Sequence, residues 1–143
     1  MDLSHILTHL GEERAHGYDA VVPPIVQSGN FTYPTVAAMR ATVQREMERP
    51  LYTRGFNPTV GMLRQKLAAL EHAEDALVFS SGSAAIAAAV MSFVKAGDHI
   101  VCVEKPYSWT KKLLVELLER FQVTHTFVDG TDAENYRRAI QPN

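Results

Sequence analysis

The fold is indicated most clearly by residues 76–103, ALVFSSGSAAIAAAVMSFVKAGDHIVCV. The apolar run 76–79 predicts a short strand, and the small residues 80–83 predict a turn. Residues 84–95 then predict an alanine-rich helix capped by the glycine at 97, and 99–103 predict a second strand. The whole stretch therefore predicts a strand, a helix and a second strand in succession.

The residues that follow continue this alternation. They predict a helix over 113–121, a strand over 123–128 and a final helix over 133–140. Strands that alternate with helices are typical of an α/β fold with a parallel sheet and right-handed crossovers. A parallel sheet needs both faces covered and usually more than three strands, so we expect this chain to be part of a larger fold.

The N-terminal region has a different character. A short helix is predicted to end near Gly11, and the adjacent Pro23 and Pro24 exclude a helix interior or a central strand, which indicates an extended arm. A helix is then predicted after Pro34 and stopped by Pro50, with one apolar face formed by Val36, Met39, Val43 and Met47.

A further helix is predicted to begin at Asn57 and Pro58, an Asx cap followed by proline at the first helical position. Its predicted buried stripe consists of Val60, Leu63, Leu67 and Leu70. We therefore divide the chain into an arm with a linking helix and loop over 1–57, and an incomplete α/β domain over 58–143.

The composition argues against several classes of protein. With 14 basic and 16 acidic residues, the chain lacks the basic excess that a nucleic-acid backbone requires. One cysteine, Cys102, allows neither an internal disulfide nor a cysteine-based zinc site, and His5 and His9 have no third ligand nearby, so no metal site is predicted. Asp129 and Asp132 suit turn and capping roles. Without a secretion signal or an apolar run that spans a bilayer, we expect no membrane contact and a cytoplasmic protein.

Three groups of residues are candidates for binding. The amides that open a helix, together with Gly82 and the hydroxyls of Ser81 and Ser83, form a phosphate seat, although ordinary serine capping explains the same pattern. Tyr52 and Arg54 lie two apart in a predicted extended loop, where they either grip one anion together or form a solvated pair.

The third candidate is Tyr107, which follows the predicted strand 99–103. Ligands of open α/β sheets bind beyond the carboxyl ends of the strands, so this aromatic ring can cover a flat ligand there. The alternative is a tyrosine that packs at the start of a helix.

Taken in order, these segments resemble the Cys/Met-metabolism (trans-sulfuration) family of pyridoxal-phosphate (PLP) enzymes, which includes cystathionine synthases, cystathionine lyases and methionine γ-lyase. The similar segments are Pro23-Pro24-Ile25, Gln27-Ser28, Tyr52-Thr53-Arg54, Asn57-Pro58-Thr59, a run formed by Glu71, Ala73 and residues 76–85, then Gly97-Asp98-His99-Ile100 and Tyr107.

The resemblance implies a fold, a cofactor and roles for these residues. The fold would be the first part of the large domain of PLP-dependent transferases of the aspartate-aminotransferase type I, and the cofactor would be pyridoxal 5′-phosphate. Ser81, Gly82 and Ser83 would seat the cofactor phosphate, and Tyr107, the candidate catalytic residue, would stack on the pyridine ring. Tyr52 and Arg54 would reach the phosphate of the neighbouring subunit's cofactor.

The family resemblance also implies an activity and an assembly. The complete protein would be a carbon–sulfur lyase or a γ-synthase, that is, a lyase or transferase acting on a sulfur amino acid such as cystathionine or methionine. Its active site would be shared across a dimer within a homotetramer, a dimer of dimers.

The sequence departs from the family pattern at several positions. Ser83 replaces the usual methionine, and Ser108-Trp109 replaces a small, glycine-rich pair, which leaves the substrate open. None of Lys105, Lys111 and Lys112 matches the family's Schiff-base lysine, so we expect the 143-residue chain alone to be inactive.

Two other functions are compatible with this pattern. One is a non-catalytic remnant of the PLP fold that acts as a binding or interaction module. The other is a phosphate-binding α/β domain unrelated to PLP, which explains the turn at 81–82 but not Tyr52 and Arg54.

Overall fold

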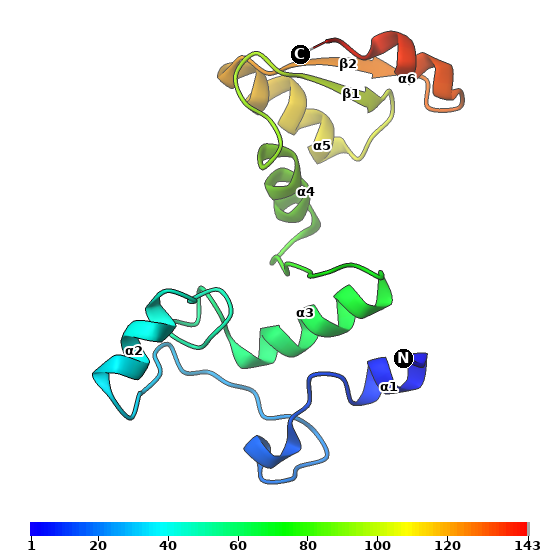
Figure 1. Cartoon of the computed structure of the whole chain (residues 1–143). Helices are drawn as coiled ribbons and strands as arrows, with labels where there is room; N and C mark the ends of the chain where they lie inside the picture. The colour runs from blue at the N-terminus through cyan, green and yellow to red at the C-terminus, as the bar shows by residue number, and fades with distance from the viewer. Residues whose placement is uncertain (143) are drawn as a thin grey trace. The chain divides into compact units, whose positions relative to one another are not determined.

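A computed structural model of the chain describes residues 1–142, apart from the side chain of His16. The chain forms two compact units, Met1–Val78 and Phe79–Asn143, here called the first and second units (Figure 1). This division follows the contacts within the chain, and the proposed division of the family domain at 57/58 stays a prediction.

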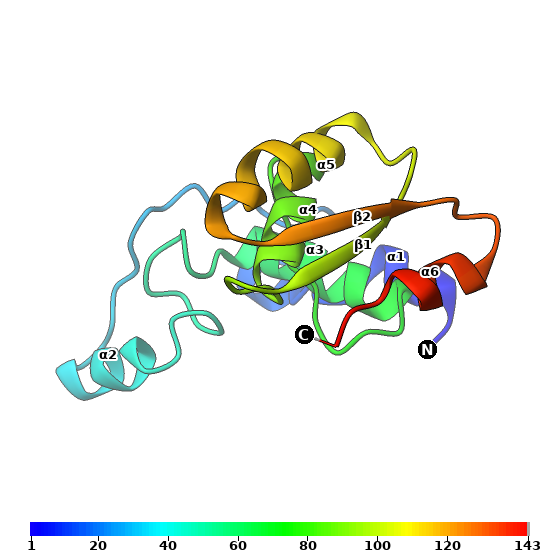
Figure 2. The same ribbon diagram turned by 90° about the horizontal axis from the view of Figure 1, so that it is seen from above.

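The second unit contains two parallel strands joined by a helical crossover (Figure 2). Strand β1 spans His99–Val103 and β2 spans Thr124–Val128, with the first residues of the two strands opposite each other in register. The connection consists of α5 (Ser108–Lys112), the π-helical turn η2 (Leu113–Leu117) and the 3-10 turn η3 (Leu118–Phe121). Helix α6 (Ala133–Ala139) follows β2. The predicted α/β class and both later strands are confirmed.

The core of the second unit lies between the crossover helix, the strands and α4 (Gly82–Met91). Four residues are buried at its centre: Leu113, Leu114, Leu118 and Val123. Partly buried residues of α4, of the segment after it and of both strands pack against them, namely Ile86, Ala87, Val90, Val94, Ile100, Cys102 and Phe127. Helix α4 thus contributes Ile86, Ala87 and Val90 to the packing around this core.

Two predictions for this unit are wrong. Residues 76–79 form no strand, because β1 pairs only with β2 among the described residues, and Leu77 is 63% exposed. The helix predicted over 84–95 begins earlier and ends at Met91, so Gly97 does not cap it. Gly97 lies instead in the turn before β1 with a φ of +93°, a conformation that favours glycine.

The first unit consists of short helices joined by an irregular arm. Its elements are α1 (Leu3–Thr8), the 3-10 turn η1 (Arg14–Gly17), α2 (Val36–Val43) and α3 (Pro58–Leu70). Helix α2 ends at Val43, earlier than predicted, because the backbone turns over 44–48. Its predicted apolar face is exposed in this chain, including Val36 at 63% and Met47 at 53%.

Helix α3 begins where the sequence predicts, but its buried face is a different one. Asn57 caps the helix and Pro58 opens it, while the predicted stripe of Val60, Leu63, Leu67 and Leu70 is 37–45% exposed. The buried residues of α3 are Gly61 and Ala68. These small residues permit close packing, since a Cβ at position 61 would lie 2.8 Å from the ring of Phe56.

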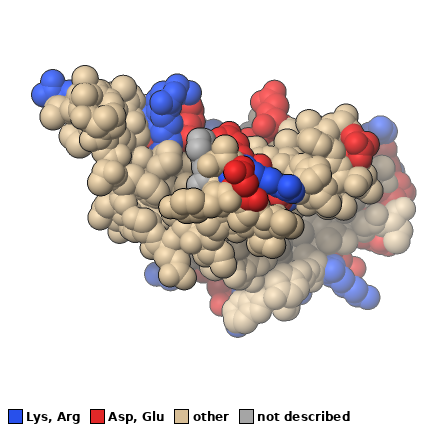
Figure 3. All heavy atoms as spheres, turned by 90° about the horizontal axis from the view of Figure 1, so that it is seen from below, with Lys and Arg blue, Asp and Glu red and all other residues tan. Residues whose placement is uncertain are grey.

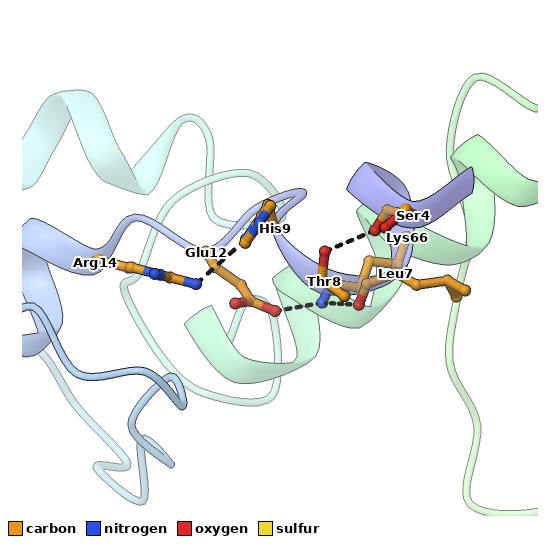
Figure 4. A network of polar contacts seen from close by, with 7 residues as sticks. All are labelled: Ser4, Leu7, Thr8, His9, Glu12, Arg14 and Lys66. Carbon is orange, nitrogen blue, oxygen red and sulfur yellow. Dashed lines mark hydrogen bonds and ion pairs between the residues drawn. The ribbon is translucent and has the colours of Figure 1, made fainter. Parts of the chain in front are cut away.

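A polar network fastens α1 and the turn after it to α3 (Figure 4). Lys66 of α3 donates a hydrogen bond to the carbonyl oxygen of Leu7 at 2.9 Å and pairs with the Glu12 carboxylate. Beside it, Arg14 contacts Nδ1 of His9 at 3.2 Å. Lys66 thus joins two segments that lie more than 50 positions apart in the sequence.

Acid is expected to weaken this network. The hydrogen bond and charge of Lys66 hold the pKa of Glu12 below its ordinary value of 4.5. A carboxyl group whose pKa is lowered by folding stabilises the folded state at pH values above its ordinary pKa. This stabilisation is lost as the pH falls below that pKa. We therefore expect Glu12→Gln to lower the urea midpoint at pH 7, with the difference from wild type shrinking below pH 4.5. Glu46→Gln, at an exposed position of the same unit, is the control. It should leave the urea midpoint unchanged both at pH 7 and in acid.

The surface carries charges of both signs. On the face shown in Figure 3, basic and acidic side chains are interspersed among uncharged ones. Within residues 1–142, no helix has the length and apolar character needed to cross a membrane.

Candidate functional site

The turn before α4 combines a helix cap with unpaired amides. Oγ of Ser81 accepts a hydrogen bond from the amide of Ala84 at 3.1 Å, which confirms the capping interpretation. The amides of Gly82 and Ser83 lie in the first helical turn and have no hydrogen-bond partner among the described residues. A Cβ built at Gly82 meets no atom within 4 Å, so the space in front of it is open. An anion can therefore reach these amides while the cap stays in place.

Tyr107 lies beyond the carboxyl end of β1, as predicted, and leads into α5. Its carbonyl oxygen accepts a hydrogen bond from the amide of Lys111 at 3.1 Å, but its side chain makes no capping bond and is 57% exposed. Trp109, two residues on, is 54% exposed, and Nζ of Lys112 lies 4.9 Å from the centre of its ring. The start of α5 thus presents two aromatic side chains to solvent.

Helix α4 packs against α5 within the second unit. The turn at 81–83 and Tyr107 therefore begin two helices that contact each other. The sequence predicts that both groups follow the carboxyl ends of strands, whereas among the described residues only Tyr107 follows a strand.

Tyr52 and Arg54 meet in the first unit. Cζ of Arg54 lies 5.2 Å from the centre of the Tyr52 ring, so the two side chains are neighbours, as predicted. The predicted extended backbone is wrong, however, because residues 53–55 form a turn in which the amides of Gly55 and Phe56 donate to the carbonyl oxygen of Tyr52 at 2.9 and 3.2 Å. Glycine is needed at 55, since a Cβ there would lie 2.9 Å from the carbonyl oxygen of Glu46.

Asn57 connects this turn to α3 and to the arm. Its Oδ1 accepts from the amides of Thr59 and Val60, which is the predicted cap. Its Nδ2 donates to Oγ1 of Thr53 at 2.6 Å and to the carbonyl oxygen of Val26 at 2.9 Å. Sequence reasoning found the cap but missed these two bonds, although an asparagine cap always leaves its two amide hydrogens available.

The arm is held to the same place by further bonds. Oγ1 of Thr59 accepts from the amide of Val26 at 2.9 Å and donates to the carbonyl oxygen of Pro24 at 3.3 Å. The amide of Thr53 donates to the carbonyl oxygen of Gly29 at 3.0 Å. The Asn-Pro-Thr segment and residue 53 therefore fix residues 24–29 of the arm beside the Tyr52–Arg54 turn.

The structure also places the residues that the sequence made weaker candidates for chemistry. Burial raises the pKa of the Cys102 thiol, which disfavours a nucleophilic thiolate. Asp132 caps α6, and Oδ1 of Asp129 accepts from the amide of Thr131 at 2.9 Å, as their predicted roles require. The rings of His5 and His9 meet edge to face at 5.7 Å. Among the described residues, no three His, Cys, Asp or Glu side chains are grouped so that they could hold a metal ion.

A parallel α/β unit with an open helix N-terminus and an exposed tyrosine beyond a strand is suited to a phosphorylated, flat ligand. More particularly, the chain belongs to the Cys/Met metabolism PLP-dependent enzyme family, which it matches over residues 4–143. The expected family, fold class and cofactor are thereby confirmed.

Three similar proteins serve as examples. The chain is 39% identical to an L-methionine gamma-lyase of Treponema denticola, over 88% of this chain and 31% of that protein. It is 34% identical to a canavanine gamma-lyase of Rhizobium leguminosarum bv. trifolii, over 96% of this chain and 34% of that protein. The crystal structure of metB from Corynebacterium glutamicum aligns with a TM-score of 0.87 and 32% identity, over 100% of this chain and 35% of that one. The chain thus spans about a third of the length of these relatives.

The described residues fit PLP by their chemistry. A phosphate dianion accepts hydrogen bonds from free amides at a helix start, and the space at Gly82 admits it. Arg54 and Tyr52 supply a fork of N–H donors and a phenol, and the exposed ring of Tyr107 offers a stacking surface.

Proposed function

We propose that the complete protein is a PLP-dependent carbon–sulfur lyase or γ-synthase acting on a sulfur amino acid, and that this chain supplies part of its cofactor site. The observation that supports the proposal best is the capped start of α4, where the amides of Gly82 and Ser83 are unpaired beside open space. Its sequence context is that of a family whose members depend on PLP.

Each residue of the site has a distinct role in this proposal. The amides of Gly82 and Ser83 bind the phosphate, and the Ser81 cap holds those amides in the helix. Tyr107 stacks on the pyridine ring and sets its orientation. When bound, PLP supplies the electron-withdrawing ring that weakens bonds at the substrate's α-carbon.

The Tyr52–Arg54 pair acts on a second subunit in this proposal. Arg54 donates to the phosphate of the neighbouring subunit's cofactor, and Tyr52 adds a single hydrogen bond. The active site is then completed by association, in a homo-oligomer that is a dimer of dimers. We place this enzyme in the cytoplasm, where Cys102 of this chain stays reduced.

In this proposal, the lysine that forms the Schiff base with the cofactor is not among residues 1–142. Nζ of Lys111 lies 5.4 Å from the centre of the Phe127 ring, and Lys112 lies over Trp109. The 143-residue chain on its own is therefore proposed to bind PLP without turning over substrate.

Comparing PLP with pyridoxal, which lacks the phosphate, tests the proposal. Equilibrium dialysis should show at least tenfold tighter binding of PLP, because a charge-assisted phosphate bond is worth roughly 1.5–3 kcal/mol. Equal affinity for the two compounds would contradict the phosphate seat, whereas a folded protein that binds neither compound would favour the non-catalytic binding module.

A charge placed at the seat should abolish this preference. Gly82 has no atoms within 4 Å of a built Cβ and no positive φ, so it accepts a side chain without strain. Gly82→Asp puts a carboxylate beside the amides and is expected to lower PLP affinity by about tenfold or more. Gly82→Asn, of equal size but neutral, is the matched control and should lose much less. Equal losses in both variants would mean that the phosphate binds elsewhere.

A further inference from the structure

We infer that Thr53 is a positioning residue for the Tyr52–Arg54 pair: its hydroxyl, bonded to Asn57, holds the turn that brings the two side chains together. This inference rests on the proposed function, in which that pair binds a phosphate. It assigns a role to Thr53, the middle residue of the Tyr-Thr-Arg segment. Unlike its two neighbours, Thr53 has no contact with the cofactor in the proposed function.

The three consecutive side chains divide between two tasks. Tyr52 and Arg54 contact each other, with 5.2 Å between Cζ and the ring centre. The side chain of Thr53 between them accepts a hydrogen bond from Nδ2 of Asn57 at 2.6 Å. One side chain therefore anchors the turn while its two neighbours remain available.

The side chain of Asn57 is held in place because both its oxygen and its nitrogen make hydrogen bonds. Its Oδ1 caps α3 by accepting from the amide of Thr59 at 2.9 Å. Its second Nδ2 bond reaches the carbonyl oxygen of Val26 at 2.9 Å, and that residue's amide is held in turn by Oγ1 of Thr59. Thr53 is thus tied to the start of α3 and to the arm together.

Arg54 depends on this anchor more than its neighbour does. Tyr52 is also held by an antiparallel bridge to Asn30. The guanidinium of Arg54 lies over the Tyr52 ring and makes no hydrogen bond or ion pair among the described residues. A long, flexible side chain loses rotamer entropy when it binds, so its reach toward a phosphate is set by the turn that carries it.

The hydroxyl is the part of Thr53 that the inference requires. Thr53→Val keeps the shape and removes the acceptor, whereas Thr53→Ser keeps the acceptor and removes the methyl group. Thr53 and its bond to Asn57 are exposed, so water replaces the lost partner and the fold is expected to survive either change.

The test measures the ratio of the dissociation constants for pyridoxal and PLP in the purified protein. Arg54→Ala provides the benchmark for loss of the pair. Thr53→Val is expected to lower the ratio at least fivefold, and Thr53→Ser should stay within twofold of wild type. If Thr53 had only a structural role, the substitution would weaken the binding of both compounds to the same extent and leave the ratio unchanged.

The outcomes separate this inference from the proposed function. A wild-type ratio near one, or a ratio that Arg54→Ala leaves unchanged, contradicts the proposed phosphate contact itself. A ratio that falls in Arg54→Ala but not in Thr53→Val overturns the positioning role alone. Should Thr53→Val lose its far-UV circular dichroism, Asn57→Ser replaces it, since serine still caps α3 but is too short to reach Thr53. A wild-type ratio in that variant also overturns the role.

Discussion

Replacing Arg54 with alanine is expected to weaken PLP binding by roughly ten- to a hundredfold, since one charge-assisted hydrogen bond contributes about 1.5–3 kcal/mol. The guanidinium supplies the only full positive charge in the proposed set of phosphate ligands, alongside a helix start and a phenol. Without the guanidinium, the negative charge of the phosphate has no full positive charge beside it in the proposed site. The affinity for pyridoxal, which has no phosphate, should stay nearly unchanged.

The measurement is a PLP titration of the assembled protein, with thermal unfolding as a check of the fold. Arg54 is exposed and its side chain makes no hydrogen bond or ion pair among the described residues, so alanine should not lower the melting temperature. Arg54→Lys, which keeps the charge but not the planar fork, should give an intermediate affinity. Arg40→Ala, at an exposed position of α2, is the control. Unchanged PLP affinity in Arg54→Ala would remove this residue from the site.

Leu114→Ala is expected to destabilise the second unit by about 2–5 kcal/mol, the range for truncating a fully buried leucine. Leu114 is 2% exposed and lies at the centre of the core with Leu113, Leu118 and Val123. Alanine leaves a cavity between α4 and the strands that the surrounding side chains fill only in part.

Urea denaturation followed by tryptophan fluorescence measures this effect. Trp109 is the one tryptophan of the chain and lies in the second unit, so its emission reports on that unit. Leu117→Ala is the matched control, because Leu117 belongs to the same helical turn but is 37% exposed. It should cost about 1 kcal/mol or less. Equal losses for the two leucines would contradict the packing described here.

Much of the secondary structure could be predicted because its signals are local. Asn57 with Pro58 marks the start of α3, and Ser81 marks the start of α4 through a bond to an amide three residues on. The strands at 99–103 and 124–128 are rich in β-branched residues and lie between turns. Each of these features depends on residues within a few positions of one another.

The errors arise where a partner outside the segment decides the structure. The apolar run 76–79 has strand character, but a strand forms only beside another strand, and none among the described residues bonds to it. The stripe of α3 has helical spacing, yet the face that packs carries Gly61 and Ala68, because Phe56 approaches the first of them. Periodicity shows that a face is apolar but not what covers it.

The sequence by itself determined the α/β class, the start of α3 and the PLP family, and it predicts the residues of the candidate site, because short motifs carry all of these. Only the tertiary structure decided how the Tyr52–Arg54 pair is supported. Its bonds from Asn57 and Thr59 to the arm join residues 31 to 35 positions apart, so no local pattern encodes them. Such contacts form only when the folded chain brings a distant donor and acceptor within hydrogen-bond distance.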